Sequence, residues 1–260
     1  MIKALTTAAT GLEAQQVKIE NIANDLANVN TDGYKRSNTE FHDLMYETVR
    51  SPGDTLGSNT QTAVGIQVGR GVKVGTSHKN FEQGPTKMTY NPLDLMIEGS
   101  GFFPVQTPQG EIAYARTGAF HIDAQGNLQL SNGSKLIPQM VVPVNATSVV
   151  ISQSGEVRVT LPGGAEAVLG QIQIVNFQNN QGLVAQGSGL YKASVASGAA
   201  VESIPGEGGT GYIHQGALEG SNVNVANSMV DMITTQRAYE LGTKIMGVAD
   251  QMLSTTVNIK

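Results

Sequence analysis

Residues 21–37 read NIANDLANVNTDGYKRS, and they mark where a helical pattern ends and another kind of chain begins. One face of the helical part carries amides at helical spacing, namely Asn21, Asn24 and Asn28. Another face is apolar, with Ile22, Leu26 and Val29. Gly33 then stops the pattern, because glycine is a natural helix terminator. An amide stripe where a solvated helix would carry Lys and Glu predicts contact with a partner, which we expect to be another copy of the chain.

The helix that leads into this stretch has a heptad-like apolar stripe. Its positions are spaced by three and four residues, with Gln15 as an interruption: Leu5, Ala8, Leu12, Ile19, Ile22, Leu26 and Val29. Spacing of this kind is typical of a helix that packs against other helices.

The C-terminal end mirrors this pattern from about Val225 onward, with Ser221, Asn222 and Asn224 as candidate N-caps. The apolar positions of the second helix are Ala226, Val230, Ile233, Leu241, Ile245, Val248 and Met252. Gly242 and Gly247 lower its helix propensity, so we expect packing to hold it.

The chain between the helices alternates apolar and polar residues with period two, for example at Val157, Val159 and Leu161, and turn signals such as DAQG separate the short runs. We therefore predict an α+β fold, in which a discontinuous N- and C-terminal helical coiled-coil layer accompanies a central all-β domain of many short strands. The predicted domains are 1–35 with 222–260 (helical), 36–84 (extended linker) and 85–221 (β-rich and outer).

Composition excludes several classes of function. Charged residues are only 14% of the chain and the net charge is -5, which argues against nucleic acid as a partner. The absence of cysteine excludes disulfides and thiolate sites. The N-terminus has no continuous apolar run, so we expect no cleaved signal peptide, and no run reaches the ~18 residues of a membrane span.

Motifs for chemistry are weak. Residues 206–211, GEGGTG, match the spacing of a dinucleotide-binding loop, but the residues that follow resemble a strand rather than the required helix. His42, His78, His121 and His214 have no ligand spacing. We therefore expect no catalytic residue, no cofactor and no metal.

The outer faces of both helices are poor in charge and rich in Ala, Ser, Thr, Asn and Gln. A two-helix pair facing water would be heavily charged there, so we predict helices that contact copies of themselves. The predicted self-assembly residues are Leu5, Leu12, Ile19, Ile22, Leu26, Val29, Val230, Ile233, Leu241, Ile245, Val248 and Met252. A plain intramolecular hairpin, a secreted β-rich binding protein with a helical oligomerisation stalk and a polysaccharide-active enzyme remain alternatives.

Residues 46–64 have weak periodicity and a turn-prone composition. Extended at about 3.3 Å per residue, they could reach roughly 60 Å. We predict that this segment docks between subunits and stiffens the assembly, through Tyr46, Val49, Leu56 and Val64 as apolar anchors and Pro52 and Gly53 as bends.

Three motifs resemble the rod and hook family of axial proteins of the bacterial flagellum. NIANDLANVNTDGYKRS is similar to the family's N-terminal signature, with Asp25 where asparagine is more usual. The C-terminal helix, with Gln236-Arg237-Ala238-Tyr239-Glu240 at its centre, is similar to the C-terminal signature. The stretch from Asp94 to Gly133 resembles the central β-motif, and within the family the chain resembles the distal rod subunits most closely.

The resemblance implies a structural subunit that leaves the cell through the flagellar type III export channel without signal cleavage. Such subunits polymerise into a rigid hollow drive shaft that transmits torque and crosses the periplasm to the outer membrane. The implied partners are copies of the chain, proximal rod proteins, the hook protein or a hook–rod adaptor, and the P-ring and L-ring proteins. A proximal rod or hook subunit is the alternative within the family.

Overall fold

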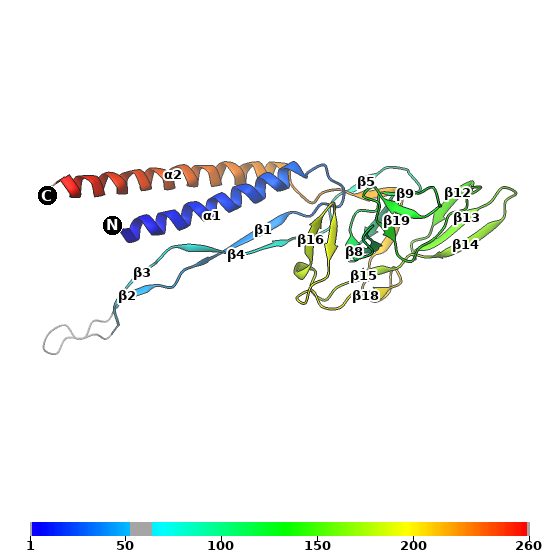
Figure 1. Ribbon diagram of the computed structural model, residues 1–260, viewed down its shortest axis with the longest axis horizontal. Helices are drawn as coiled ribbons and strands as arrows, with labels where there is room; N and C mark the ends of the chain where they lie inside the picture. The colour runs from blue at the N-terminus through cyan, green and yellow to red at the C-terminus, as the bar shows by residue number, and fades with distance from the viewer. Residues whose placement is uncertain (1, 53–63, 259–260) are drawn as a thin grey trace. The chain divides into compact units, whose positions relative to one another are not determined.

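The computed structural model describes residues 2–52 and 64–258, and the chain divides into two compact units (Figure 1). Unit 1 comprises residues 1–26, 37–78 and 224–260, and unit 2 comprises residues 27–36 and 79–223. Both units are therefore built from stretches that lie far apart in the sequence.

Unit 2 is organised around a seven-stranded antiparallel sheet with the order β16–β17–β8–β7–β11–β10–β9. In chain order these strands are β7 (Phe103–Gln106), β8 (Ile112–Ala115), β9 (Phe120–Ile122), β10 (Leu128–Leu130), β11 (Lys135–Leu136), β16 (Val184–Gly187) and β17 (Leu190–Lys192).

Smaller sheets complete unit 2. A three-stranded sheet contains β12 (Ser148–Ile151), β13 (Glu156–Thr160) and β14 (Glu166–Gln171). The two-stranded pairs are β5 (Thr86–Met88) with β20 (Ala217–Glu219), β6 (Leu95–Glu98) with β19 (Tyr212–Gln215), and β15 (Ile174–Asn176) with β18 (Val201–Ser203). A 3-10 helix, η1, spans Asn180–Gly182.

The predicted turn signals explain why neighbouring strands pair. DAQG lies between β9 and β10, where the Asp123 carboxylate accepts a hydrogen bond from the Gln125 amide at 2.6 Å. Four further signals lie between paired neighbours: PQG at 108–110, SNG at 131–133, QSG at 153–155 and PGG at 162–164. Asn, Asp and Gly close such hairpins because they tolerate the backbone conformations that tight turns require.

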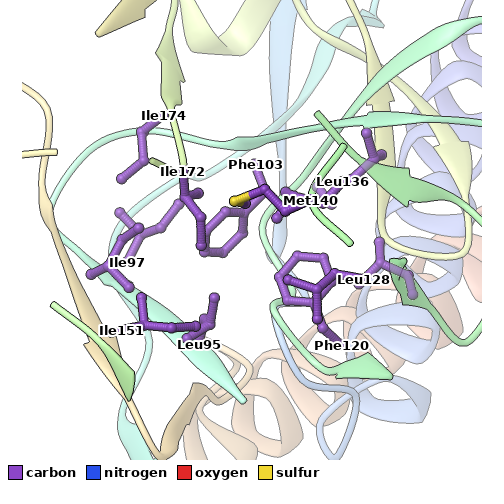
Figure 2. Close-up of a cluster of buried hydrophobic side chains, with 14 of the residues drawn as sticks. Leu95, Ile97, Phe103, Phe120, Leu128, Leu136, Met140, Ile151, Ile172 and Ile174 are labelled. Carbon is purple, nitrogen blue, oxygen red and sulfur yellow. The ribbon is translucent and has the colours of Figure 1, made fainter. Parts of the chain in front are cut away.

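The interior of unit 2 consists of two apolar clusters. The larger one gathers side chains from several strands, and Figure 2 shows Phe103 and Phe120 inside a shell of Leu, Ile and Met side chains. These two rings meet edge to face, with centroids 5.4 Å apart. The second cluster is aromatic and contains Phe102, Tyr114 and Phe177. Unit 2 thus buries a core that its own chain completes.

Unit 1 contains both long helices, α1 (Ile2–Ala27) and α2 (Val225–Asn258). It also contains two ribbons of two strands each. One pairs β1 (Ser37–Asp43) with β4 (Val72–Lys79), and the other pairs β2 (Glu47–Arg50) with β3 (Ile66–Val68), which run antiparallel. Asn224 caps α2, because its side-chain oxygen accepts a hydrogen bond from the Asn227 amide at 3.2 Å.

Two helices and a many-stranded β-unit confirm the predicted α+β class. The predicted three-part division stays a prediction. Within residues 36–84, the structure describes four paired strands, β1 to β4, and residues 37–78 belong to the unit that contains the helices.

Candidate assembly surfaces

One face of α1 packs on the β1–β4 ribbon through polar groups. The Asn21 side-chain amide donates to the Thr39 hydroxyl at 2.6 Å, and the Thr10 hydroxyl accepts from the Val72 amide at 3.4 Å. The Asp25 carboxylate, which is buried, accepts from the Ser37 amide with both oxygens at 3.1 Å. This face therefore holds the ribbon by hydrogen bonds.

Gly71 shows how closely the ribbon approaches α1. Its φ is +113°, and a Cβ there would lie 2.2 Å from the Thr10 hydroxyl oxygen. L-residues rarely adopt such a backbone conformation, and the space is already filled. Only glycine fits at this position without a shift of the helix or the ribbon.

One member of the amide stripe, Asn21, has a partner within its own chain, and contact of the stripe with another copy stays a prediction. The side chain of Asn21 bonds to Thr39. The physical reason is that a two-stranded ribbon leaves polar groups along its face, and a helix with short polar side chains can satisfy them at close range.

The predicted apolar stripe of α1 lies on a different side of this helix. Its members on α1 are all partly covered within the chain: Leu5, Leu12, Ile19, Ile22 and Leu26. Val29, also predicted for this stripe, is partly covered but lies in the turn after the end of α1 at Ala27. Leu12 lies against α2 at Gly242, where an added Cβ would come within 2.7 Å of the leucine Cδ2. The glycine that lowers the helix propensity of α2 thus makes room for Leu12.

The covered face of α2 is not the stripe that the sequence analysis selected. Positions four and three residues apart are partly or fully covered: Ser228, Met232, Thr235, Gly242, Met246, Ala249 and Leu253. Thr235 is the most buried of them, and its hydroxyl donates to the Asp231 carbonyl at 2.6 Å. Small residues dominate this face, which permits close approach of another element.

The selected apolar residues of α2 form a second stripe beside that face, and the chain leaves them in solvent. Their side chains are 52% to 60% exposed: Val230, Ile233, Leu241, Ile245, Val248 and Met252. We call these six residues the open stripe. An exposed, contiguous apolar surface of this kind marks an interaction site more often than not.

The predicted stiffening segment is described only at its ends. Tyr46, Val49 and Val64 are exposed, at 55%, 64% and 78%, and Pro52 is exposed as well. Gly53 and Leu56 lie outside the described residues. The apolar anchors that the structure describes are therefore free of contacts large enough to cover them within the chain.

A cavity of about 630 Å³ lies in unit 1 between the first turns of α1 and the β2–β3 ribbon. Ala4, Ala8, Val68 and Ile245 contribute to its lining. At its edge Lys3 Nζ and a Glu47 carboxylate oxygen are 2.7 Å apart, and this lysine holds the pKa of Glu47 below its usual range. The open stripe thus reaches this cavity at Ile245.

The structure also places the motifs that were examined for chemistry. GEGGTG at 206–211 forms a turn that leads directly into β19, so the loop lacks the helix N-terminus that would hold a pyrophosphate. Among residues 2–52 and 64–258, no three His, Asp or Glu side chains are grouped as metal ligands would be. Neither helix, over the residues described, is apolar enough along its length to cross a bilayer.

Comparison with known proteins gives three family matches along the chain. Residues 5–35 match the family described as Flagella basal body rod protein. Residues 96–159 match the Flagellar hook protein FlgE/F/G D1 domain, and residues 214–259 match the Flagellar basal body rod FlgEFG protein C-terminal family. The matches occur in the order of the three motifs in the sequence.

Full-length relatives give the same result. Flagellar basal-body rod protein FlgG of Buchnera aphidicola subsp. Acyrthosiphon pisum is 44% identical over 254 residues, which cover 97% of this chain and 98% of the relative. FlgG of Caulobacter vibrioides is 43% identical over 261 residues, and FlgG of Bacillus subtilis is 35% identical over 265 residues, both over 100% of each chain.

The chain belongs to the flagellar basal-body rod protein family. The prediction of a flagellar rod and hook family member is thereby confirmed, as is the prediction of a structural rod subunit. For a rod protein, the exposed apolar surfaces of unit 1 are the candidate functional site, because a structural subunit acts through its contacts.

Proposed function

We propose that this rod protein is a distal rod subunit, and that it polymerises into a hollow helical tube through the open stripe of α2. The observation that supports this proposal is the exposure of the stripe. Its six side chains are each more than half exposed, whereas the neighbouring face of α2 is partly or fully covered. Full burial of a large aliphatic side chain contributes roughly 1.5–3 kcal/mol, so six exposed residues favour association strongly.

In this proposal the two helices of one subunit pair as a coiled coil. The contact of Leu12 with Gly242 and the heptad spacing of the covered face support such pairing. The open stripe then contacts the helices of neighbouring subunits. Contacts that repeat head to tail build helical tubes rather than closed dimers.

Membership of the rod family supports the remaining parts of the proposal. The tube would act as a drive shaft that transmits torque to the hook and carries the export channel. It would lie in the basal body between the periplasm and the outer membrane, next to proximal rod proteins, the hook protein or a hook–rod adaptor, and the P-ring and L-ring proteins. The subunit would reach this place without cleavage of a signal peptide.

The substitution Ile245→Asp tests the open stripe. A carboxylate there would be buried without a partner in the tube, so polymer should be lost while the monomer keeps its circular dichroism spectrum. Thr243→Asp is the matched control, because Thr243 is exposed on the side of α2 away from the stripe. Sedimentation of the purified chains measures polymer. Normal polymer from Ile245→Asp, or equal loss from both variants, would exclude the stripe as the specific contact.

Deletion of residues 46–64 tests the proposed stiffening segment. If this segment locks neighbouring subunits against sliding, the deletion should still polymerise but give curved or flexible tubes. Persistence length is measured from electron micrographs, with wild-type polymer prepared in parallel as the reference. Tubes as straight as wild type would show that the segment does not supply stiffness.

A further inference from the structure

Unit 2 buries three charged side chains that come from positions far apart in the sequence, namely Lys35, Arg116 and Glu219. The side chains of Lys35 and Glu219 have no exposed surface, and that of Arg116 is 4% exposed. Charged residues are almost never buried to this degree unless they are paired. We call these three residues the ion cluster.

Glu219 supplies the negative charge of the ion cluster. One of its carboxylate oxygens accepts from Lys35 Nζ at 2.6 Å and from the Gly84 amide at 2.8 Å, and the other accepts from Arg116 Nε at 2.5 Å. Over residues 2–52 and 64–258, no other carboxylate forms an ion pair with either cation. Two cations against one carboxylate give the ion cluster a net charge of +1.

Backbone carbonyls complete the surroundings of the two cations. Arg116 donates to the carbonyls of Gly101 at 2.5 Å and Gly99 at 2.6 Å. Lys35 donates to the Glu82 carbonyl at 2.6 Å, and burial lowers its pKa against the opposing effect of the carboxylate. A carbonyl carries only a partial charge. The carboxylate is therefore the group that offsets the cost of burying two cations.

The apolar core of unit 2 ends earlier in the sequence than the ion cluster does. The last residue of the larger apolar cluster is Ile213, and the last buried residue of the aromatic cluster is Tyr191. Glu219 follows both of them, whereas Lys35 and Arg116 precede both. A partly synthesised chain that extends just beyond Ile213 thus contains every side chain of the core and both cations, but not the carboxylate.

We propose that the ion cluster is a completion check on unit 2, so that a partly synthesised chain cannot hold the fold until Glu219 joins the two cations. Loss of one partner from a buried ion pair is strongly destabilising, because it leaves an uncompensated charge. Domains are only marginally stable, so this cost outweighs a core that is otherwise assembled. Chains that lack the end of unit 2 therefore stay unfolded.

The substitution Glu219→Gln in the full-length chain tests the charge balance. It keeps the shape of the side chain but raises the net charge of the ion cluster from +1 to +2, and the double variant Lys35→Met/Glu219→Gln returns it to +1. The Glu82 carbonyl keeps a donor in the double variant. Asn222 Nδ2 donates to this carbonyl at 3.1 Å, and also to the Asn80 carbonyl at 2.9 Å.

Amide exchange in β7 and β8, which lie in the core of unit 2, measures the opening of the unit. Exchange should speed up by roughly a hundredfold or more in Glu219→Gln, and the double variant should recover at least about tenfold of this change. Glu202→Gln is the matched control, because Glu202 is exposed on β18, and it should exchange like wild type.

Complete unfolding of unit 2 in Glu219→Gln would be the extreme form of the expected result, and the double variant would still decide its cause. Equal exchange in the single and double variants would mean that lost hydrogen bonds, and not an uncompensated charge, open the unit. That outcome would overturn the proposal.

Ribosome-bound chains test whether the check acts during synthesis. Residues 1–218 and 1–223 are each followed by an unstructured linker that holds them outside the ribosome, so neither ends in a free carboxylate. Limited proteolysis should cut unit 2 in the shorter chain and leave it intact in the longer one. Lys35→Met in the shorter chain removes one uncompensated cation and should increase its resistance several-fold.

Resistance of the unsubstituted shorter chain, or no gain from Lys35→Met, would overturn the proposal. Neither the exchange nor the proteolysis experiment involves polymer. A sedimentation result that excludes the proposed function would therefore leave this inference standing, and failure of the completion check would leave the proposed function standing.

Discussion

The two units of this rod protein differ in where their apolar residues lie. Unit 2 buries two clusters of side chains, and Ile97, Phe103 and Val105 have no exposed surface. In the part of unit 1 that the structure describes, only Ala14, Asp25 and Thr235 are buried. Unit 2 is therefore stabilised by its own chain, whereas the long helices keep much of their apolar surface available for other contacts.

The two units also differ in how their polar groups are bonded. Unit 2 buries an ion cluster whose members have several partners each. In unit 1, hydrogen bonds of Thr10, Asn21 and Asp25 join α1 to its ribbon. A unit held by few and partly exposed bonds opens more easily than one with a closed core. This comparison predicts different responses to cutting, to substitution and to pH.

Removal of both long helices should have the largest effect. A chain of residues 27–223 should fold and unfold cooperatively in urea, because it retains both apolar clusters of unit 2. Peptides of residues 1–26 and 224–260 should be largely unfolded alone, since isolated helices are marginal in water. Circular dichroism measures both. A helical peptide, or a disordered 27–223 chain, would reverse the comparison.

Substitution of Gly71 should affect unit 1 more moderately. Gly71→Ala introduces an unfavourable φ and displaces the Thr10 hydroxyl, for an expected cost of roughly 2–3 kcal/mol in local opening. Gly69→Ala is the control, because a Cβ there would be 3.5 Å from Tyr46 and in ordinary contact. Amide exchange at Val72 measures the opening. Equal exchange in the two variants would mean that the ribbon is not held at Gly71.

Alkaline pH should have the smallest effect, and it concerns unit 2. Burial raises the pKa of Tyr191 to about 12, with Glu219 adding to the increase. The folded state therefore keeps this proton in a range where the unfolded state loses it. The stabilisation is complete below pH 10 and is lost as the pH approaches 12, by about 1 kcal/mol at pH 11.

Tyr191→Phe tests this pH dependence. Phenylalanine has no hydroxyl to titrate, so the free energy of unfolding of this variant should fall less steeply above pH 10. Lys35 affects stability in the opposite direction. Because its pKa is lowered in the folded state, the unfolded chain holds this proton up to about pH 10.5 while the folded chain has released it, so stability rises with pH in that range. Urea titrations of the 27–223 chain between pH 9 and 11 measure both slopes. Identical slopes above pH 10 in wild type and Tyr191→Phe would contradict the assignment to Tyr191.

The sequence was sufficient for the parts of the fold that depend on periodicity and turn chemistry. The stripe of α1 indicated a helix, and Asn-, Asp- and Gly-rich turns indicated short antiparallel strands. The three motifs also indicated the family. These signals are local, so each can be read from a short window without knowledge of its partners.

Contacts between distant residues were not predictable in the same way. The covered face of α2 includes Ser228, Thr235 and Gly242, which carry no apolar signal, so the open stripe was the more visible pattern. Lys35, Arg116 and Glu219 were not recognised as a buried cluster, because a charged residue is normally assumed to lie at the surface. Two of these three stood in the quoted motifs or beside them, but their spacing in sequence carried no sign of the ion pairs.

The hydrogen bond between Asn222 and Asn80 joins residues 142 positions apart, and so it brings the two ends of the 79–223 stretch of unit 2 together. The entropy lost in closing such a loop grows only with the logarithm of its length, by about 0.6 kcal/mol for each doubling. Unit 2 could therefore grow or shrink between these two residues at a small entropic cost, as long as its ends still meet. The β-rich part of the chain is free to diversify in length for this reason.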